Sequence, residues 1–391
     1  MGYLTEPRVF LDTSGSAPMS ARTREAFLAA ADDGWADPDR QHSESRRAHA
    51  LLDGAAQAIA AVLGAPAEQT LIVPTFGLAF DRAIGGVARA RVGGGAHAPG
   101  GGGPQAAVGR GRIVATAVER KPVLRVADRF SEELTIVGVD SGGVVNLENF
   151  GRALDKAGAL DDTASVALVQ HANQETGVLQ PLAEAHEAAR AAGVPLVVDA
   201  TASVGHMDPP EAWDALVADP ADWGGPRGVA VIAFRATTRW VPLPPIVTGR
   251  VNVAAALAAA VALEEREANR AEVAPRLAAL AARIRAAAAE LPATVVFVPA
   301  GPALPHLVTF ACAGADGAVL AAELDQRGFA VGSGSACTTE PSPESHVWEA
   351  LGASGRGVVR VGLHPGLTDQ DVDRFIVALR DAAAALIASA R

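Results

Sequence analysis

The residue best suited to nucleophilic chemistry is Cys337, which ends the segment Ser-Gly-Ser-Ala-Cys at residues 333–337. Cysteine attacks as its thiolate, and an ordinary thiol has a pKa of about 8.5, so a reactive one needs exposure or a cationic neighbour. On a loop of small residues, the thiolate could reach a substrate sulfur atom and carry it away as a persulfide. The alternative is a small buried hydrophobic residue, but the glycine and serine residues before Cys337 argue against burial. Cys312, inside the apolar segment HLVTFAC, fits that alternative.

Three more residues with functional side chains lie in or directly after apolar runs. Asp199 lies in VPLVVDA (194–200), Asn173 follows SVALVQH (165–171), and Arg360 interrupts VVRVGL (358–363). An aspartate at this position can also simply cap a turn. Lysine, the residue that forms imines with carbonyl groups, occurs only as Lys121 and Lys156. The basic residues are otherwise arginines, which cannot replace a catalytic lysine.

The candidate functional residues must be positioned by the elements around them. In this sequence short β-branched or apolar runs alternate with Ala-rich helical segments. The alternation predicts an α/β domain with a mostly parallel sheet covered by helices on both faces. The runs are residues 70–74, 111–117, 134–140, 165–171, 194–200 and 228–234.

The pattern changes near residue 250, where a long helix (about 252–290) leads into strand-like segments and helices at 316–327 and 368–389. This change predicts two domains, a large one at 9–255 and a smaller C-terminal α+β domain at 256–391. We expect residues 1–20 to pack with the smaller domain.

Composition excludes several classes of function. The net charge of −11 argues against a nucleic-acid surface, which needs clustered positive charge. No apolar run is long enough to span a bilayer, and the N-terminus does not resemble a signal peptide. Two cysteines fit a reducing cytoplasm. No metal site is predicted, and the Gly-rich segment 93–108 is interpreted as a surface linker.

Residues 329–365 resemble the active-site segment of cysteine desulfurases, a branch of the class V aminotransferases with the fold type I, aspartate aminotransferase-like architecture. HANQETGVLQPL (171–182) and VVDATASVGH (197–206) resemble two further segments of that family. Weaker similarity covers 9–18, 42–55 and 248–263, so that the resemblance runs from about residue 9 to 385.

The resemblance implies roles for these residues in binding pyridoxal phosphate (PLP) and substrate. Asn173 corresponds to the residue that binds the ring hydroxyl of PLP, and Asp199 to the one that pairs with the pyridinium nitrogen. Arg360 corresponds to the arginine that binds the substrate carboxylate, and Cys337 to the persulfide carrier. The resemblance also implies a dimer with the active site at the interface.

The cofactor pattern is broken at the position of the Schiff-base lysine, where alignment to GGPRG (224–228) places Asp222. Arg120 stands where an aromatic residue, normally histidine, stacks on the ring. Only Thr75 and Gly77 remain as phosphate donors in the first phosphate turn. Gly249-Arg250 replaces the second phosphate contact, and Ala202 replaces a glutamine beside the ring hydroxyl.

Three hypotheses follow from this combination. In the first, the chain is a degenerate desulfurase that relays persulfide sulfur through Cys337. In the second, it is an active PLP-dependent desulfurase, lyase or transferase that uses noncovalent PLP or Lys121. In the third, it is a regulatory or scaffold subunit. The expected partners are a second copy or an active desulfurase paralogue, together with a sulfur-acceptor protein.

Overall fold

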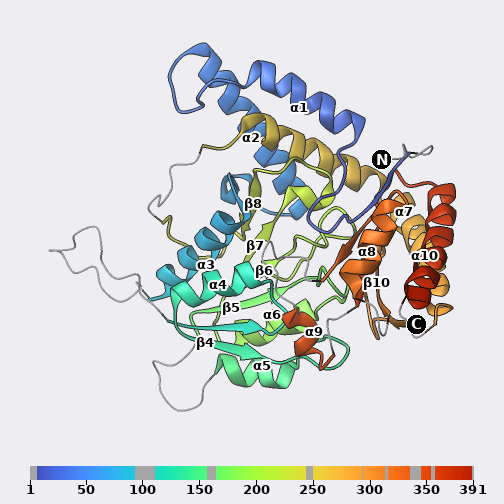
Figure 1. The fold of residues 1–391 in the computed structure, drawn as a ribbon. Helices are drawn as coiled ribbons and strands as arrows, with labels where there is room; N and C mark the ends of the chain where they lie inside the picture. The colour runs from blue at the N-terminus through green and yellow to red at the C-terminus, as the bar shows by residue number, and fades with distance from the viewer. Residues whose placement is uncertain are drawn as a thin grey trace.

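The computed structural model describes residues 7–92, 111–155, 164–243, 250–292, 294–312, 316–334, 345–353 and 357–389. These residues form two sheets, each covered by helices (Figure 1). The Gly-rich segment 93–108, Lys156 and Cys337 lie outside the described residues.

The larger sheet has seven strands in the order β2-β8-β7-β6-β5-β3-β4. Strands β7, β6, β5, β3 and β4 run parallel, and β8 is antiparallel to both of its neighbours. This arrangement confirms the predicted α/β fold. The strands are β2 (Thr70–Val73), β3 (Gly111–Thr116), β4 (Ser131–Val137), β5 (Val166–Gln170), β6 (Leu196–Asp199), β7 (Ala215–Ala218) and β8 (Ala230–Phe234).

Helices bury both faces of this sheet because successive side chains along a strand point to opposite sides. In β3, Val114 packs into one core, while Ile113 and Ala115 pack into the other. The first core contains residues of α2 (Ser43–Leu63), α5 (Leu147–Leu154), α6 (Leu182–Ala191) and the N-terminal half of α7 (Val253–Ala289). The second contains residues of α3 (Phe76–Val92) and α4 (Lys121–Phe130).

The smaller sheet has five strands in the order β1-β11-β12-β10-β9. Its edge strand β1 comes from the N-terminus and pairs in parallel with β11, with Val9 opposite Phe329. The N-terminal segment therefore packs on the C-terminal sheet. The strands are β1 (Val9–Leu11), β9 (Thr294–Phe297), β10 (Leu307–Cys312), β11 (Phe329–Ser333) and β12 (Val358–Gly362).

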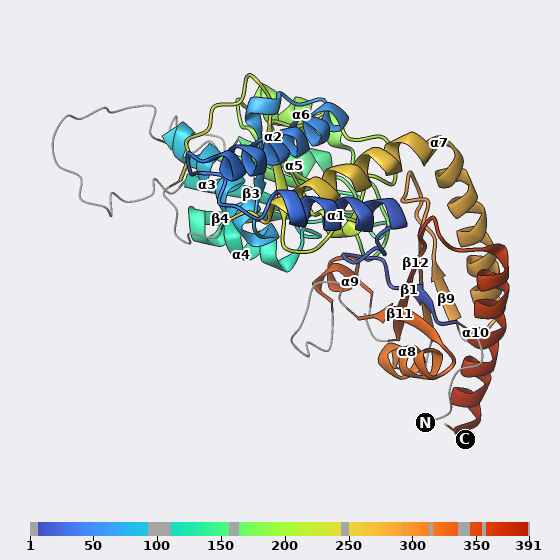
Figure 2. The ribbon, with the colours of Figure 1, turned by 90° about the horizontal axis from the view of Figure 1, so that it is seen from above.

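Helix α7 joins the two cores. Its residues before Pro275, such as Leu263, pack against the large sheet, and later ones such as Leu280 pack against the small sheet. A proline inside a helix removes one backbone hydrogen bond and bends the helix axis. Figure 2 shows α7 running from the large sheet to the small sheet. The predicted domain boundary at 255/256 falls near the start of this helix and stays a prediction.

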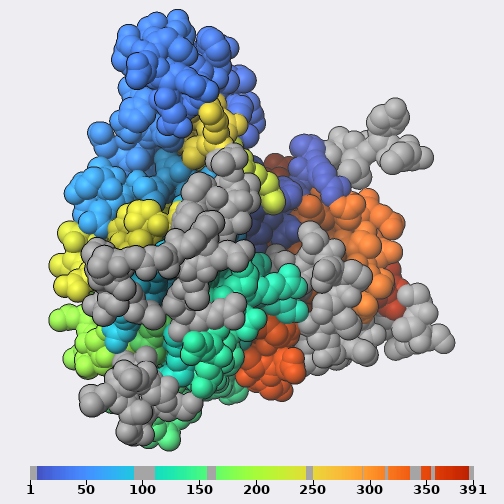
Figure 3. All heavy atoms as spheres, turned by 90° about the vertical axis from the view of Figure 1, so that its left-hand side faces the viewer, coloured from blue at the N-terminus to red at the C-terminus, as the bar shows by residue number. Residues whose placement is uncertain are grey.

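Helices α8 (Gly317–Gln326) and α10 (Asp369–Ser389) complete the core of the small sheet. Helix α9 (His346–Ala350) packs with Val118 and Val358. Helix α1 (Ala21–Asp33) lies along α7 and projects with the start of α2 beyond the rest of the molecule (Figure 3). No helix among the described residues combines the length and hydropathy that crossing a membrane requires.

We expect Gly317→Ala to lower the thermal unfolding midpoint and to reduce the free energy of unfolding by about 1–3 kcal/mol. A Cβ at Gly317 would lie 2.3 Å from the Val358 carbonyl oxygen, because α8 begins directly against β12. Gly151→Ala in α5 is the matched control, since a Cβ there meets nothing within 4 Å. This control should leave the midpoint unchanged or raise it, because alanine favours helix. Calorimetry of the full chain measures both, and equal midpoints would contradict the close packing of α8 on β12.

Candidate functional site

Three of the predicted site residues, Arg120, Asn173 and Asp199, meet at the carboxyl edge of the large sheet, where open α/β sheets bind ligands. Asp199 is the last residue of β6 and lies opposite Gln170, the last residue of β5. Asn173 follows β5 by three residues, and Arg120 follows β3 and directly precedes α4. Since β3, β5 and β6 are neighbours that run in parallel, these side chains converge.

A largely buried ion pair joins Arg120, whose side chain is 12% exposed, to Asp199, whose side chain is 4% exposed. Arg120 Nε donates to Asp199 Oδ2 at 2.8 Å, and its Nη2 lies 3.4 Å from Oδ1. Asp199 Oδ1 also accepts from the Thr201 backbone N–H at 3.0 Å. The guanidinium lies over the Phe76 ring, 4.0 Å from its centroid, and donates to Gln174 Oε1. Arg120 therefore neutralises the carboxylate and fills the space between Asp199 and Phe76.

Asp222 lies in the short helical turn η3 (Pro220–Trp223), which the Asp219 carboxylate caps by accepting from the Ala221 N–H. One Asp222 oxygen, Oδ1, accepts from the Gly15 N–H at 3.0 Å. The other, Oδ2, is buried and has no hydrogen-bond partner. Burial raises the pKa of Asp222 to about 7, although the charge on Arg120 opposes the shift.

A second buried carboxyl group, Glu119, was not identified from the sequence. Its Oε1 accepts from Thr116 Oγ1 at 2.7 Å and from the Gln170 N–H at 2.8 Å. Burial raises its pKa to about 7. The only signal in the sequence was its place directly before Arg120, because nothing in VERKPVL indicates that this glutamate points inward.

Asn173 holds the turn that follows β5. Its Oδ1 accepts from the backbone N–H groups of Glu175 and Thr176, both at 2.9 Å, and its Nδ2 donates to the Val118 carbonyl. Thr309 of the small sheet donates to the Glu175 carbonyl at 2.6 Å. The side chain of Asn173 is thus engaged within the protein, and its contact with a ring hydroxyl stays a prediction.

The residues expected near a phosphate group lie at the start of α3 and before α7. Thr75 Oγ1 accepts from the Leu78 N–H at 3.2 Å, so it caps the first turn of α3, which contains Gly77. Arg250 forms an ion pair with Asp37. Thr75 and Arg250 are therefore engaged with other parts of the chain, and the phosphate role of this set stays a prediction.

Arg360 extends from β12, and its side chain is only 4% exposed. Its Nη2 lies 3.3 Å from Asp12 Oδ1, and its Nη1 lies 3.4 Å from the Gly334 carbonyl oxygen. Its Nε is buried without a partner. Gly332 leaves room for this pair, because a Cβ there would lie 2.5 Å from Arg360 Nη2. The sequence identified Arg360 but not Asp12 or Gly332.

The N-terminal segment connects these two groups of residues. Asp12 contacts Arg360, and Gly15, three residues later, donates to Asp222. Three residues of extended chain span roughly 10 Å, so Arg360 and Asp222 face the same short stretch. The site therefore lies where the two sheets meet.

Lys121, the candidate for a relocated Schiff base, and Cys312, interpreted from the sequence as a small hydrophobic residue, both lie in the described part of the chain. Lys121 is the first residue of α4 and is partly buried. Cys312 ends β10, half-buried, with Thr294 Oγ1 3.4 Å from its Sγ. Cys337 lies outside the described residues, so its predicted role is untested.

The described residues do not fit PLP. Both oxygens of Asp199, which would face the pyridinium nitrogen, are already within 3.4 Å of the Arg120 guanidinium. Asp222, which the resemblance predicts at the position of the Schiff-base lysine, carries a carboxylate, and a carboxylate cannot form an imine. The one lysine in the described part of the chain, Lys121, opens a helix beside the ion pair.

The family model of class V aminotransferases matches residues 104–251 and 246–375. The chain belongs to the class V aminotransferase family. It is 27% identical to the cysteine desulfurase NifS of Azotobacter vinelandii, over 94% of this chain and 90% of that protein. It is 28% identical to an IscS-like cysteine desulfurase of Mycobacterium tuberculosis, over 96% of each.

Solved structures show the same fold. A NifS-like protein superposes with a TM-score of 0.81 at 21% identity, covering 96% of this chain and 99% of that one. The apo structure of a cysteine desulfurase from Thermococcus onnurineus superposes with a TM-score of 0.76 at 19% identity, covering 97% and 95%. The chain is thus cysteine desulfurase-like in sequence and fold, within a family in which PLP is expected.

We expect Asp222→Asn to stabilise the protein increasingly as pH rises from 4 to 7. A carboxyl group whose pKa is about 7 when folded binds its proton more tightly folded than unfolded, so the wild type loses stability across this interval. Asp222→Asn has no carboxyl group at this position and does not lose stability in this way. Its free energy of unfolding should exceed that of the wild type by about 1–4 kcal/mol above pH 7. Thermal midpoints of both proteins between pH 4 and 8 measure it. Asp381→Asn, at an exposed position of α10, is the control, and parallel pH profiles for Asp222→Asn and wild type would contradict the raised pKa.

Proposed function

We propose that this chain is a degenerate cysteine desulfurase that has lost PLP chemistry and relays or regulates sulfur transfer through Cys337. The observation that carries the proposal is the ion pair between Arg120 and Asp199. PLP, when bound to an enzyme, supplies an electron sink that depends on a protonated ring nitrogen beside a carboxylate. Here the permanently charged guanidinium of Arg120 is paired with the carboxylate of Asp199.

The environment of Asp222 supports the same conclusion. In a PLP enzyme of this family, a lysine at this position holds the cofactor and moves a proton. Asp222 is buried against the Gly15 N–H and has its pKa raised to about 7. Its chemistry is that of a buried acid, so this position supplies neither an amine nor a covalent link.

Cys337 is the residue left for sulfur chemistry. In the relay, its thiolate attacks the outer sulfur of a donor persulfide, the donor S–S bond breaks, and the donor leaves as a thiolate. Sulfur moves from one cysteine to another with no net oxidation, so no further reactant is needed. A reducing cytoplasm, a dimer with itself or with an active desulfurase paralogue, and a sulfur-acceptor protein belong to this proposal.

We expect the wild type to form no borohydride-stable adduct with PLP, because Arg120 and Asp222 occupy the positions that would hold it. The double variant Arg120→His/Asp222→Lys should form one adduct at position 222. Visible absorbance, followed by reduction, intact mass and peptide mapping, gives the readout. Asp381→Lys, which adds a lysine on the exposed face of α10, is the control for nonspecific modification. A wild-type adduct on Lys121, with sulfide release from cysteine, would establish the active-enzyme alternative instead.

We also expect wild-type protein to gain one sulfur atom when incubated with an active cysteine desulfurase and cysteine. Cys337→Ser should lose this label, while Cys312→Ser should keep it, because Cys312 is half-buried beside Thr294. Alkylation and mass spectrometry locate the persulfide. Labelling that persists in Cys337→Ser would overturn the relay, whatever the outcome with PLP.

A further inference from the structure

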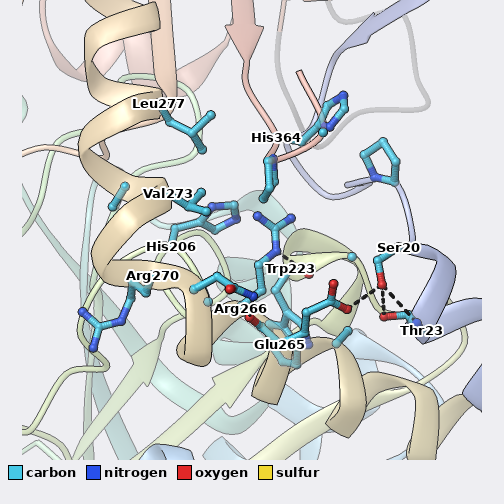
Figure 4. A pocket seen from close by; sticks show the side chains of 18 of the residues that line it. Ser20, Thr23, His206, Trp223, Glu265, Arg266, Arg270, Val273, Leu277 and His364 are labelled. Atoms are coloured by element: carbon cyan, nitrogen blue, oxygen red, sulfur yellow. Dashed lines mark hydrogen bonds between the residues drawn. The ribbon is translucent and has the colours of Figure 1, made fainter. Parts of the chain in front are cut away.

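A cavity of about 460 Å³ lies on another side of the turn that carries Asp222. Its walls come from α7, from the segment before α1, and from the turn after β12 (Figure 4). Trp223 and Gly224 line it, but none of the site residues predicted from the sequence does. Its volume is within the range of small-molecule sites.

The cavity contains a buried cation, Arg266, which is 9% exposed. Its Nε donates to the Trp223 carbonyl at 2.9 Å. Its two terminal nitrogens meet no acceptor within hydrogen-bond distance among the described residues. Figure 4 shows the side chain extending from α7 into the cavity. Burial lowers its pKa to about 10, so it remains charged at neutral pH.

The two other arginines that line the cavity, Arg270 and Arg276, already have partners within the protein. Arg270 is paired with Asp208 at 2.6 Å and with Glu267 at 3.1 Å. Arg276 donates to the carbonyl oxygens of Leu367 and Pro365. The charge of Glu265 raises the pKa of Arg266, but no hydrogen bond or ion pair joins the two side chains among the described residues. Burying a charge without such a paired partner is costly, and of the arginines that line the cavity Arg266 is the one whose terminal nitrogens meet no acceptor in the described part of the chain.

The remaining polar groups limit the charge of a counter-ion. Burial lowers the pKa of both His206 and His364, so these rings are neutral at pH 7. Glu265 faces the cavity and accepts from Ser20 Oγ at 2.5 Å, and the exposed Glu272 lies at its wall. These carboxylates would repel a second negative charge, so a dianion such as phosphate does not fit.

We propose that this cavity binds a small carboxylate ligand, whose carboxylate pairs with Arg266 and whose aliphatic part lies against Val273 and Leu277. A planar guanidinium matches a carboxylate through two parallel hydrogen bonds. Val273, Leu277 and Ala262 supply the apolar wall. Simple carboxylic acids and α-amino acids share this chemistry, and Glu265 favours the amino acid if its carboxylate meets the ammonium group.

Calorimetric titration of the full chain with butyrate, L-2-aminobutyrate, butyramide and inorganic phosphate tests the site. We expect one carboxylate per chain with a Kd on the order of 1 mM, as for very small ligands, and no binding of butyramide or phosphate. Tighter binding of aminobutyrate identifies the amino acid class, and tighter binding of butyrate the simple acids. Arg266→Gln should weaken carboxylate binding at least tenfold. Arg283→Gln, on the same helix but paired with Asp369, should not.

A second variant keeps the test decisive if Arg266→Gln does not fold. Ala274→Phe places a ring in the cavity from its wall and should abolish binding with Arg266 intact. The proposal is overturned if wild type shows no saturable carboxylate binding, or if butyramide or phosphate binds as well as butyrate. Unchanged binding in folded Arg266→Gln or in Ala274→Phe overturns it too. None of these outcomes depends on Cys337 or PLP.

Discussion

The ion pair between Arg120 and Asp199 sets the electrostatics of the candidate site. Breaking a buried pair by removing one partner costs about 3–5 kcal/mol, so Asp199 is not readily released to another cation. Glu119 and Asp222 are buried beside this pair, and neither forms an ion pair with Arg120 among the contacts of the described residues. Burial raises the pKa of each to about 7, and the charge on Arg120 opposes the shift without cancelling it. Arg120 thus lies at the centre of a cluster of three carboxyl groups, those of Glu119, Asp199 and Asp222.

The scaffold around this cluster is that of a class V aminotransferase, and its connections explain why distant residues matter. The N-terminal segment pairs as β1 with the small sheet and then contacts Arg360 through Asp12 and Asp222 through Gly15. Helix α7, which contains Pro275, also packs against both the large and the small sheet. Arg266 on that helix lies behind the turn of Asp222, so the cavity and the candidate site share one structural element.

Much of the fold could be predicted from the sequence because buried parallel strands are continuous apolar runs. The strands at 70–74, 111–117 and 165–171 appear in the structure within one residue or so at either end. Strand β7 was missed, since its four residues, ALVA, are too short and too rich in alanine to distinguish strand from helix. Strand β1 was also not predicted as a strand, because three residues gain strand geometry only by pairing with β11.

For the site, the sequence by itself determined which chemical groups are available. It established that lysine is absent from position 222, that an arginine stands at position 120, and that the motifs match the desulfurase pattern. Only the tertiary structure decided how those groups pair. That Arg120 turns onto Asp199, that Glu119 points inward, and that one oxygen of Asp222 has no partner depend on contacts between segments far apart in the chain. The sequence states which residue type stands at each position. Burial and ion pairing depend instead on which side chains the packed sheets bring within a few ångströms of one another.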